Sequence, residues 1–149
     1  MEKLMCFCLL LLFGCSQSAK VVDIEKEKEA IIKHSESWAQ FTTADEYFDH
    51  ITDDFIYLGP DREALSDLDS MYRWIDNICK NTDFSFVDWV TDEILIIDTI
   101  AIHRYTGTAI FTSKIDSTKS SQQFRKYIDI YRKTEKGWLA SRHMWNRNN

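Results

Sequence analysis

The sequence contains one proline and four glycines in 149 residues. Chains without a fixed structure are usually rich in these residues and poor in aromatic ones. This chain instead carries five tryptophans, six tyrosines and nine phenylalanines. It also lacks internal repeats and low-complexity tracts. We therefore expect one folded domain of ordinary size, without a long linker.

Clusters of basic residues are missing as well. The formal net charge is −6, and the 18 lysines and arginines are scattered along the chain. Because contacts to phosphates need clustered basic side chains, a nucleic acid is not an expected partner. The sequence has no glycine-rich phosphate loop and no Cys-x-x-Cys pair, so no cofactor is expected.

No metal site is predicted either. Asp53-Asp54 and the Asp67-x-Asp69 pair lack the number and spacing of ligands that a calcium loop requires. These carboxylates are better explained by the end of one helix and the N-terminal cap of another.

No hydrophobic run is long enough to span a bilayer, which takes about 20 residues. Residues 4–13 are apolar and follow Lys3, as in an export signal. Leu12-Phe13-Gly14-Cys15 resembles a bacterial lipobox, although Phe13 stands where a small residue is usual. We predict a lipoprotein signal over 1–15 with lipid on Cys15, a tether over 16–21 and a domain over 22–149. The protein would then be lipid-anchored to a membrane of the bacterial cell envelope; ordinary secretion and an uncleaved anchor are the alternatives.

A disulfide inside the domain is not expected. Cys6 and Cys8 lie in the segment to be removed, and Cys15 would carry lipid, which leaves Cys79 alone. Cys79 follows Ile75 on a helix-like stretch, which favours a buried apolar role over a reactive thiol.

Hydrophobic periodicity and turn residues predict an α+β fold. Helices are expected over 22–41, 43–51 and 66–80, a short strand over 55–58, and long strands over 84–97, 100–114, 122–132 and 137–147. Because the helices precede nearly all of the strands, we expect three helices packed on one face of a curved antiparallel sheet.

The strand expected over 122–132 has an unusual face. Tyr127, Asp129 and Tyr131 share it, because side chains alternate along a strand. A carboxylate between two phenols is rare in a hydrophobic core, where ionisable groups are seldom buried without a partner. The pattern predicts one wall of a binding pocket.

Two interpretations of Asp129 remain open at this point. It faces a cavity, or it forms a structural ion pair with Arg104, Arg125 or His103 on a neighbouring strand. In the first case His103 or His143 could act as a general base, with the carboxylate fixing its tautomer. A solvated or core histidine is the ordinary alternative for each.

The order of elements resembles the nuclear transport factor 2-like or SnoaL-like superfamily, whose cystatin-like fold is a cone. The residues that carry the resemblance are His34 with Trp38, segments 52–61, 104–108 and 126–133, Gly137-Trp138, and Trp145-Asn146, and they resemble the branch called domain of unknown function 4440. The superfamily includes ketosteroid isomerases, polyketide cyclases, dehydratases and non-catalytic binding or oligomerising domains. Fold alone therefore does not choose a reaction.

The resemblance to ketosteroid isomerases can be followed residue by residue. Asp129 stands where those enzymes keep an oxyanion donor, Gly59 stands where they keep the catalytic base, and Ser35 lies near the place of their tyrosine. A glycine cannot take a proton, so isomerisation of that type is disfavoured.

The leading prediction from the sequence is a domain that binds a small molecule without catalysis. The residues expected to bind the ligand are Trp38, Tyr57, Tyr127, Tyr131, His143 and Trp145. The runner-up is a cyclase, isomerase or dehydratase in which Asp129 and a histidine, His103 first, transfer protons. A third interpretation, allowed by the resemblance, is a homodimer through the outer face of the sheet.

The state of the cavity should separate these interpretations. A cavity filled by Trp38, Tyr57 and Tyr127 would favour the interaction domain. An open cavity with Asp129 within hydrogen-bonding reach of His103 or His143 would favour the enzyme.

Overall fold

The computed structural model describes residues 23–147. The predicted signal segment, the lipidation site Cys15 and the tether lie outside the described residues and stay predictions. Within 23–147, no helix combines the length and the hydrophobicity needed to cross a membrane.

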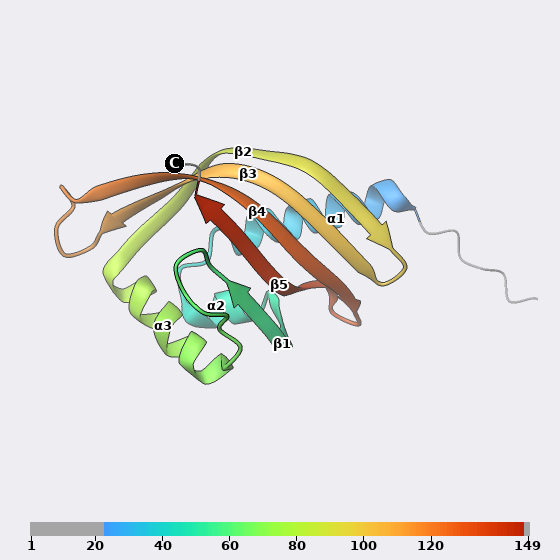
Figure 1. Ribbon diagram of the computed structural model, residues 1–149, viewed down its shortest axis with the longest axis horizontal. Helices are drawn as coiled ribbons and strands as arrows, with labels where there is room; N and C mark the ends of the chain where they lie inside the picture. The colour runs from blue at the N-terminus through green and yellow to red at the C-terminus, as the bar shows by residue number, and fades with distance from the viewer. Residues whose placement is uncertain (1–22, 148–149) are drawn as a thin grey trace, which may run out of the picture.

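Three helices and five strands make up the domain. In chain order they are α1 (Ile24–Trp38), α2 (Ala44–Phe48), β1 (Ile51–Leu58), α3 (Leu68–Asn81), β2 (Thr82–Ile97), β3 (Ile100–Ser113), β4 (Ser120–Thr134) and β5 (Gly137–Arg147). The sheet is curved and the helices lie within its curve (Figure 1). The predicted α+β class is confirmed.

The strand order is β1-β5-β4-β3-β2. Strands β2 to β5 form an antiparallel meander, and β1 pairs in parallel with β5. β5 therefore lies between the first strand of the fold and the strand that carries Asp129. This order brings an early segment of the chain beside the C-terminal strands.

The second helix is shorter than the sequence predicted. It ends at Phe48, and the prediction that it reaches residue 51 is wrong, because the chain from Ile51 onward pairs with β5. Asp53 and Asp54 consequently lie inside β1 and do not end a helix. Asp54 forms an ion pair of 2.7 Å with Arg132 on β4.

Short polar side chains begin the helices. Thr43 caps α2 by accepting a hydrogen bond from a backbone amide in the first turn. Asp67 caps α3 and accepts from the backbone N–H of Asp69 at 3.2 Å. The helix thus begins at Leu68, two residues after the start predicted at residue 66.

Two β-bulges change which residues of β2 face the helices. The partly buried residues carry even numbers up to Phe86, odd numbers at Trp89 and Thr91, and even numbers again from Ile94. The first bulge contains Asp88, whose φ of 54° is left-handed, and the second follows Thr91. Each bulge adds one residue to β2. The first bulge changes the inward-facing residues from even to odd numbers, and the second changes them back to even numbers.

A third irregularity turns the end of β5 inward. Ser141 has no partner of its own in the pairing with β4, and its hydroxyl donates to the carbonyl of Ile130 at 3.0 Å. Before this point Ala140 is buried, and after it His143 and Trp145 take the inward positions.

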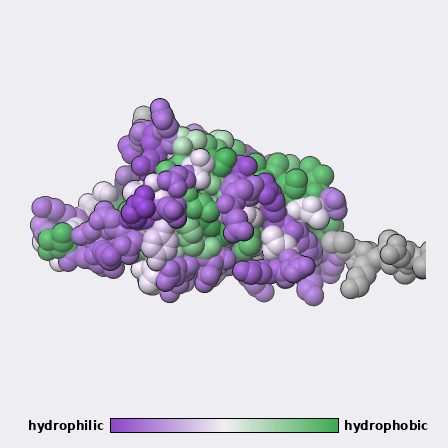
Figure 2. Space-filling model, turned by 90° about the horizontal axis from the view of Figure 1, so that it is seen from below, coloured by the Kyte–Doolittle hydropathy of each residue, from purple (hydrophilic) through white to green (hydrophobic). Residues whose placement is uncertain are grey.

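The core lies between the helices and the inner face of the sheet. It is built from aromatic and aliphatic side chains such as Ile31, Phe55 and Met71, which are fully buried. Cys79 is buried at its edge, and burial raises the pKa of its thiol. Seen from below (Figure 2), hydrophobic groups gather at the centre of the molecule between hydrophilic ones.

Candidate functional site

A row of side chains crosses the inner face of the sheet at the level of Asp129. The strand pairing places Tyr57 beside His143, His143 beside Asp129, Asp129 beside His103, and His103 beside Ile94. Neighbouring strands hold directly opposed side chains about 5 Å apart at their Cβ atoms. Asp129 is therefore flanked by a histidine on each side.

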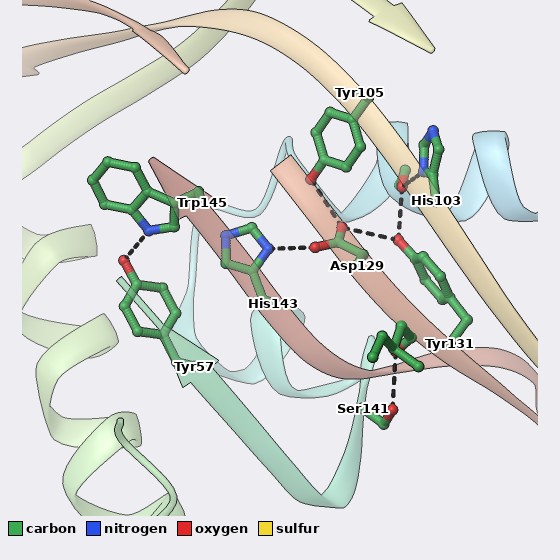
Figure 3. Close-up of polar contacts among 10 residues, drawn as sticks. Tyr57, His103, Tyr105, Asp129, Tyr131, Ser141, His143 and Trp145 are labelled. Carbon is green, nitrogen blue, oxygen red and sulfur yellow. Dashed lines mark hydrogen bonds and ion pairs between the residues drawn. The ribbon is translucent and has the colours of Figure 1, made fainter. Parts of the chain in front are cut away.

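Asp129 is fully buried and accepts three hydrogen bonds (Figure 3). Its Oδ1 atom contacts His143 Nδ1 at 2.7 Å, and its Oδ2 atom accepts from Tyr105 Oη at 2.9 Å and from Tyr131 Oη at 3.4 Å. Burial raises the pKa of both phenols, so they remain protonated donors. The partner of Asp129 is His143, and none of the alternatives Arg104, Arg125 and His103 forms an ion pair with it.

The contact with Asp129 fixes the tautomer of His143. With Asp129 as the acceptor for His143, as it is for the two phenols, Nδ1 carries the proton and Nε2 presents a lone pair. Nε2 has no hydrogen-bond partner within residues 23–147. The ring lies 5.6 Å from Tyr57 and 5.2 Å from Trp38, measured between centroids, and its side chain is 14% exposed. The basic nitrogen Nε2 of His143 thus lies among aromatic side chains.

His103, the first candidate for a catalytic base, has no free ring nitrogen. It is fully buried, and its ring nitrogens lie 3.0 Å from Ser35 Oγ and 3.0 Å from Thr91 Oγ1. Ser35 Oγ is in turn 2.7 Å from Tyr131 Oη, which reaches Asp129. His103 therefore touches Asp129 only through this chain, and both of its nitrogens are engaged.

A cavity of about 270 Å³ opens in front of His143. Of the predicted ligand-binding residues, Trp38, Tyr57, Tyr127, His143 and Trp145 line it. Tyr131 does not, because its hydroxyl is turned to Ser35 and Asp129. Asp129 itself does not line the cavity and meets it through two lining residues, His143 and Tyr105.

Other wall residues were not singled out from the sequence. Trp89 comes inward through the first bulge of β2 and stacks on Tyr105, with ring centroids 4.2 Å apart. Trp74 on α3 packs against Tyr57 with centroids 5.0 Å apart. Strand alternation starting from Phe86 places Trp89 on the outer face, so only the bulge explains its position.

Gly59 supports the wall by leaving room for Tyr57. A Cβ atom at Gly59 would stand 2.8 Å from Cε1 of Tyr57, whose hydroxyl accepts a hydrogen bond of 2.6 Å from Trp145 Nε1. We expect Gly59→Ala to displace this ring and to lower the free energy of unfolding by about 1–3 kcal/mol, measured by urea denaturation. Gly107→Ala is the matched control, because its Cβ would meet Trp89 Cα at an ordinary 3.7 Å. Equal losses in the two variants would contradict this role.

The described residues contain no group of three or more histidine, cysteine or acidic side chains arranged to hold a metal. Tyr105, Tyr131 and Nδ1 of His143 are engaged by Asp129, whereas Nε2 of His143 remains open to the cavity. What the arrangement can do chemically is therefore proton transfer at His143 Nε2.

Comparisons with known proteins give a match in structure only. No family model matches the chain. No curated protein matches it by sequence.

Many solved structures share the fold. A conserved protein from Planctomyces limnophilus is similar with a TM-score of 0.73 and 16% identity, over 83% of this chain and 99% of the other. A ketosteroid isomerase-like protein from Erwinia carotovora is similar with a TM-score of 0.67 and 17% identity, over 82% of this chain and 93% of the other.

A candidate dehydratase of the nuclear transport factor 2-like family from Streptomyces avermitilis gives a TM-score of 0.69 and 12% identity, over 84% and 99% of the two chains. At such identities the likeness concerns the fold and does not extend to the reaction. The chain has the nuclear transport factor 2-like fold, as its sequence had indicated.

Proposed function

We propose that the domain is an enzyme that removes a proton from a small, largely apolar molecule, with His143 as the general base. The observation that carries this proposal is the 2.7 Å contact between His143 Nδ1 and Asp129, which leaves Nε2 facing the cavity. Asp129 acts through His143 as a positioning residue.

The geometry supports a simple proton transfer. Nε2 of His143 takes a proton from an acidic C–H group, and the electron pair of that bond moves into the substrate, to a carbonyl oxygen or a departing group. The imidazolium that forms is stabilised by the carboxylate of Asp129. Aromatic walls keep bulk water from the charges, which strengthens this attraction.

Binding without catalysis, our first expectation from the sequence, is the second candidate. The cavity favours it, since an aromatic pocket binds an apolar ligand whether or not a reaction follows. The free nitrogen of His143 argues for the enzyme, because a site that only binds has no need of an imidazole held in one tautomer. Two of the similar structures carry names of proton-transfer enzymes, an isomerase-like protein and a candidate dehydratase.

A probe reaction tests the base without knowledge of the substrate. 5-Nitrobenzisoxazole is planar and bicyclic, and a general base opens it to a cyanophenolate by taking the C3 proton as the N–O bond breaks. We expect the purified protein to catalyse this reaction, and His143→Gln to lower kcat/KM at least about 100-fold, since general-base catalysis contributes about 10²–10⁴. The absorbance of the phenolate product measures the rate.

His50→Gln is the matched control. His50 is half-buried, contacts His34 at 3.2 Å and does not line the cavity. It should keep the wild-type rate. A wild-type rate no higher than that of free imidazole at the same concentration, or an equal loss in the two variants, would refute the proposed base.

A further inference from the structure

Arg125 places an uncompensated positive charge in the wall of the cavity. No aspartate or glutamate lines the cavity, and its other arginine, Arg147, forms an ion pair of 2.6 Å with Asp61. Arg125 has no carboxylate partner in the part of the chain that the structure describes. Its Nε and Nη2 atoms donate to the neutral amide oxygen of Gln123 at 3.1 and 2.6 Å.

The guanidinium of Arg125 is held in place by stacking. Its Cζ atom lies 3.7 Å from the ring centroid of Trp145 and 4.8 Å from that of Phe111, and both rings line the cavity. Nη1 makes no hydrogen bond within residues 23–147. A fixed, planar guanidinium with spare donors is well suited to a carboxylate.

Further positive charge gathers at the same end of the cavity. Arg62 lies over Trp74, with 4.5 Å between Cζ and the ring centroid. Arg125, Arg62 and Arg147 each act to lower the pKa of Tyr57, although burial outweighs them and raises it. The chain as a whole is negative, so this local positive field contrasts with the rest of the surface.

The wall also has more hydrogen-bond donors than acceptors. Four polar atoms on cavity-lining side chains are shielded from solvent and have no partner in the described chain: Trp38 Nε1, Tyr47 Oη, Trp89 Nε1 and Tyr127 Oη. The indoles can only donate, and burial raises the pKa of both phenols, so they stay protonated. An unpartnered buried donor costs about 1–3 kcal/mol, so these atoms lower the stability of the empty domain.

We infer that the substrate of this site is a small planar carboxylate, whose carboxylate meets Arg125 and whose conjugated rings fill the aromatic slot. The inference rests on the proposed function in taking the cavity as the substrate site. Arg125 stands four residues from Asp129 along β4, about 13 Å at their Cα atoms, and its guanidinium reaches back over Trp145, two residues from His143 on β5. The acidic C–H at His143 and the carboxylate are therefore separate groups of the substrate, about 7 Å apart along the cavity. A cavity of 270 Å³ suits a compound of one or two rings.

Paired probes test the charge directly. Calorimetric titration of the purified protein compares 2-naphthoate with 2-naphthamide, which has the same shape and no charge. We expect naphthoate to bind about tenfold more tightly, because a charge-assisted contact to a guanidinium is about twice as strong as a neutral one. Arg125→Gln should remove this preference and lower the affinity for naphthamide much less than that for naphthoate.

Arg104→Gln is the matched control for the loss of a positive charge. Arg104 is exposed, pairs with Glu93 at 3.6 Å and does not line this cavity, so the variant should keep the preference. His143→Gln should keep it too. Equal affinity for the two probes, or no binding of either, overturns the inferred carboxylate. If naphthoate is preferred while the benzisoxazole reaction is absent, the proposal of His143 as a general base is refuted and the inference of a carboxylate ligand is supported.

Discussion

Asparagine in place of Asp129 is expected to lower the rate of base catalysis about 1,000-fold while leaving His143 in its place. The amide NH₂ of asparagine would donate to Nδ1 of His143, so that the proton of the ring moves to Nε2. The nitrogen that faces the cavity then holds a proton and has no lone pair to offer. Inversion of a tautomer in this way costs about 10⁴ in a serine protease, where the histidine also works beside an aspartate.

The same substitution should also weaken the fold. Asp129 accepts from Tyr105, Tyr131 and His143 in a fully buried position, and hydrogen bonds to a charged group are the strong ones. We expect a loss of about 3 kcal/mol in the free energy of unfolding. Asp54→Asn is the control, because Asp54 pairs with Arg132 on the exposed surface, where an ion pair contributes about 0–1 kcal/mol.

Urea denaturation and the benzisoxazole assay, carried out on the same samples, separate the two effects. The rate is measured where both proteins are fully folded, so a loss of stability does not appear as a loss of activity. An Asp129→Asn variant with wild-type kcat/KM would show that Asp129 does not set the tautomer of His143.

Acidification from pH 7.5 to pH 5 is expected to destabilise the domain by about 4 kcal/mol. Burial lowers the pKa of His103 to about 4, against the attraction of Asp129. Burial and the neighbouring His50 lower the pKa of His34 to about 4 as well. A histidine in an unfolded chain has a pKa near 6.5.

Whether acid raises or lowers the stability depends on which state, folded or unfolded, binds more protons. Between pH 6.5 and 4 the unfolded chain protonates these two histidines and the folded protein does not, so stability rises with pH across this window. Each group contributes fully above about pH 6.5, and the loss reaches about 2 kcal/mol at pH 5 and about 3 kcal/mol at pH 4. Surface carboxylates whose pKa is lowered, such as Asp54 and Glu27, act only at more acidic pH.

Urea denaturation at several pH values measures this effect. His34→Gln and His103→Gln should each flatten the dependence on pH by about half, whatever they do to stability at pH 7.5. A wild-type protein that is equally stable at pH 5 and pH 7.5 would contradict the assignment of both histidines as buried neutral groups.

The sequence was sufficient to predict the class of the fold and which side chains of β4 face inward, although of the three on that face only Tyr127 lines the cavity. Alternation along a strand places Tyr127 and Asp129 on one face, and the structure has them there because β4 contains no bulge in this stretch. Alternation also places His143 and Trp145, both predicted to bind the ligand, on one face of their strand, and they take the two inward positions at the end of β5.

The partner of Asp129 could not be chosen from the sequence. His103 and His143 occupy equivalent positions on the two strands that flank β4. The choice depends on the direction of each side chain: the ring of His103 turns to Ser35 on α1 and Thr91 on β2, whereas the ring of His143 turns to Asp129. These contacts come from segments far apart in the chain, and no local pattern contains them.

Bulges account for the wall residues that the sequence did not reveal. Trp89 lies three residues after Phe86, an odd step that strand alternation assigns to the opposite face. The first bulge is marked by the positive φ of Asp88. The sequence does not reveal this φ, because aspartate is common in many backbone conformations.

The paired bulges of β2 let the sheet hold two extra residues without changing which side chains face inward before and after them. Phe86 before the first bulge and Ile94 after the second both point to the inner face. The extra residues therefore bring Trp89 into the wall of the cavity, while Ile94 keeps its place beside His103 in the row that includes Asp129 and His143.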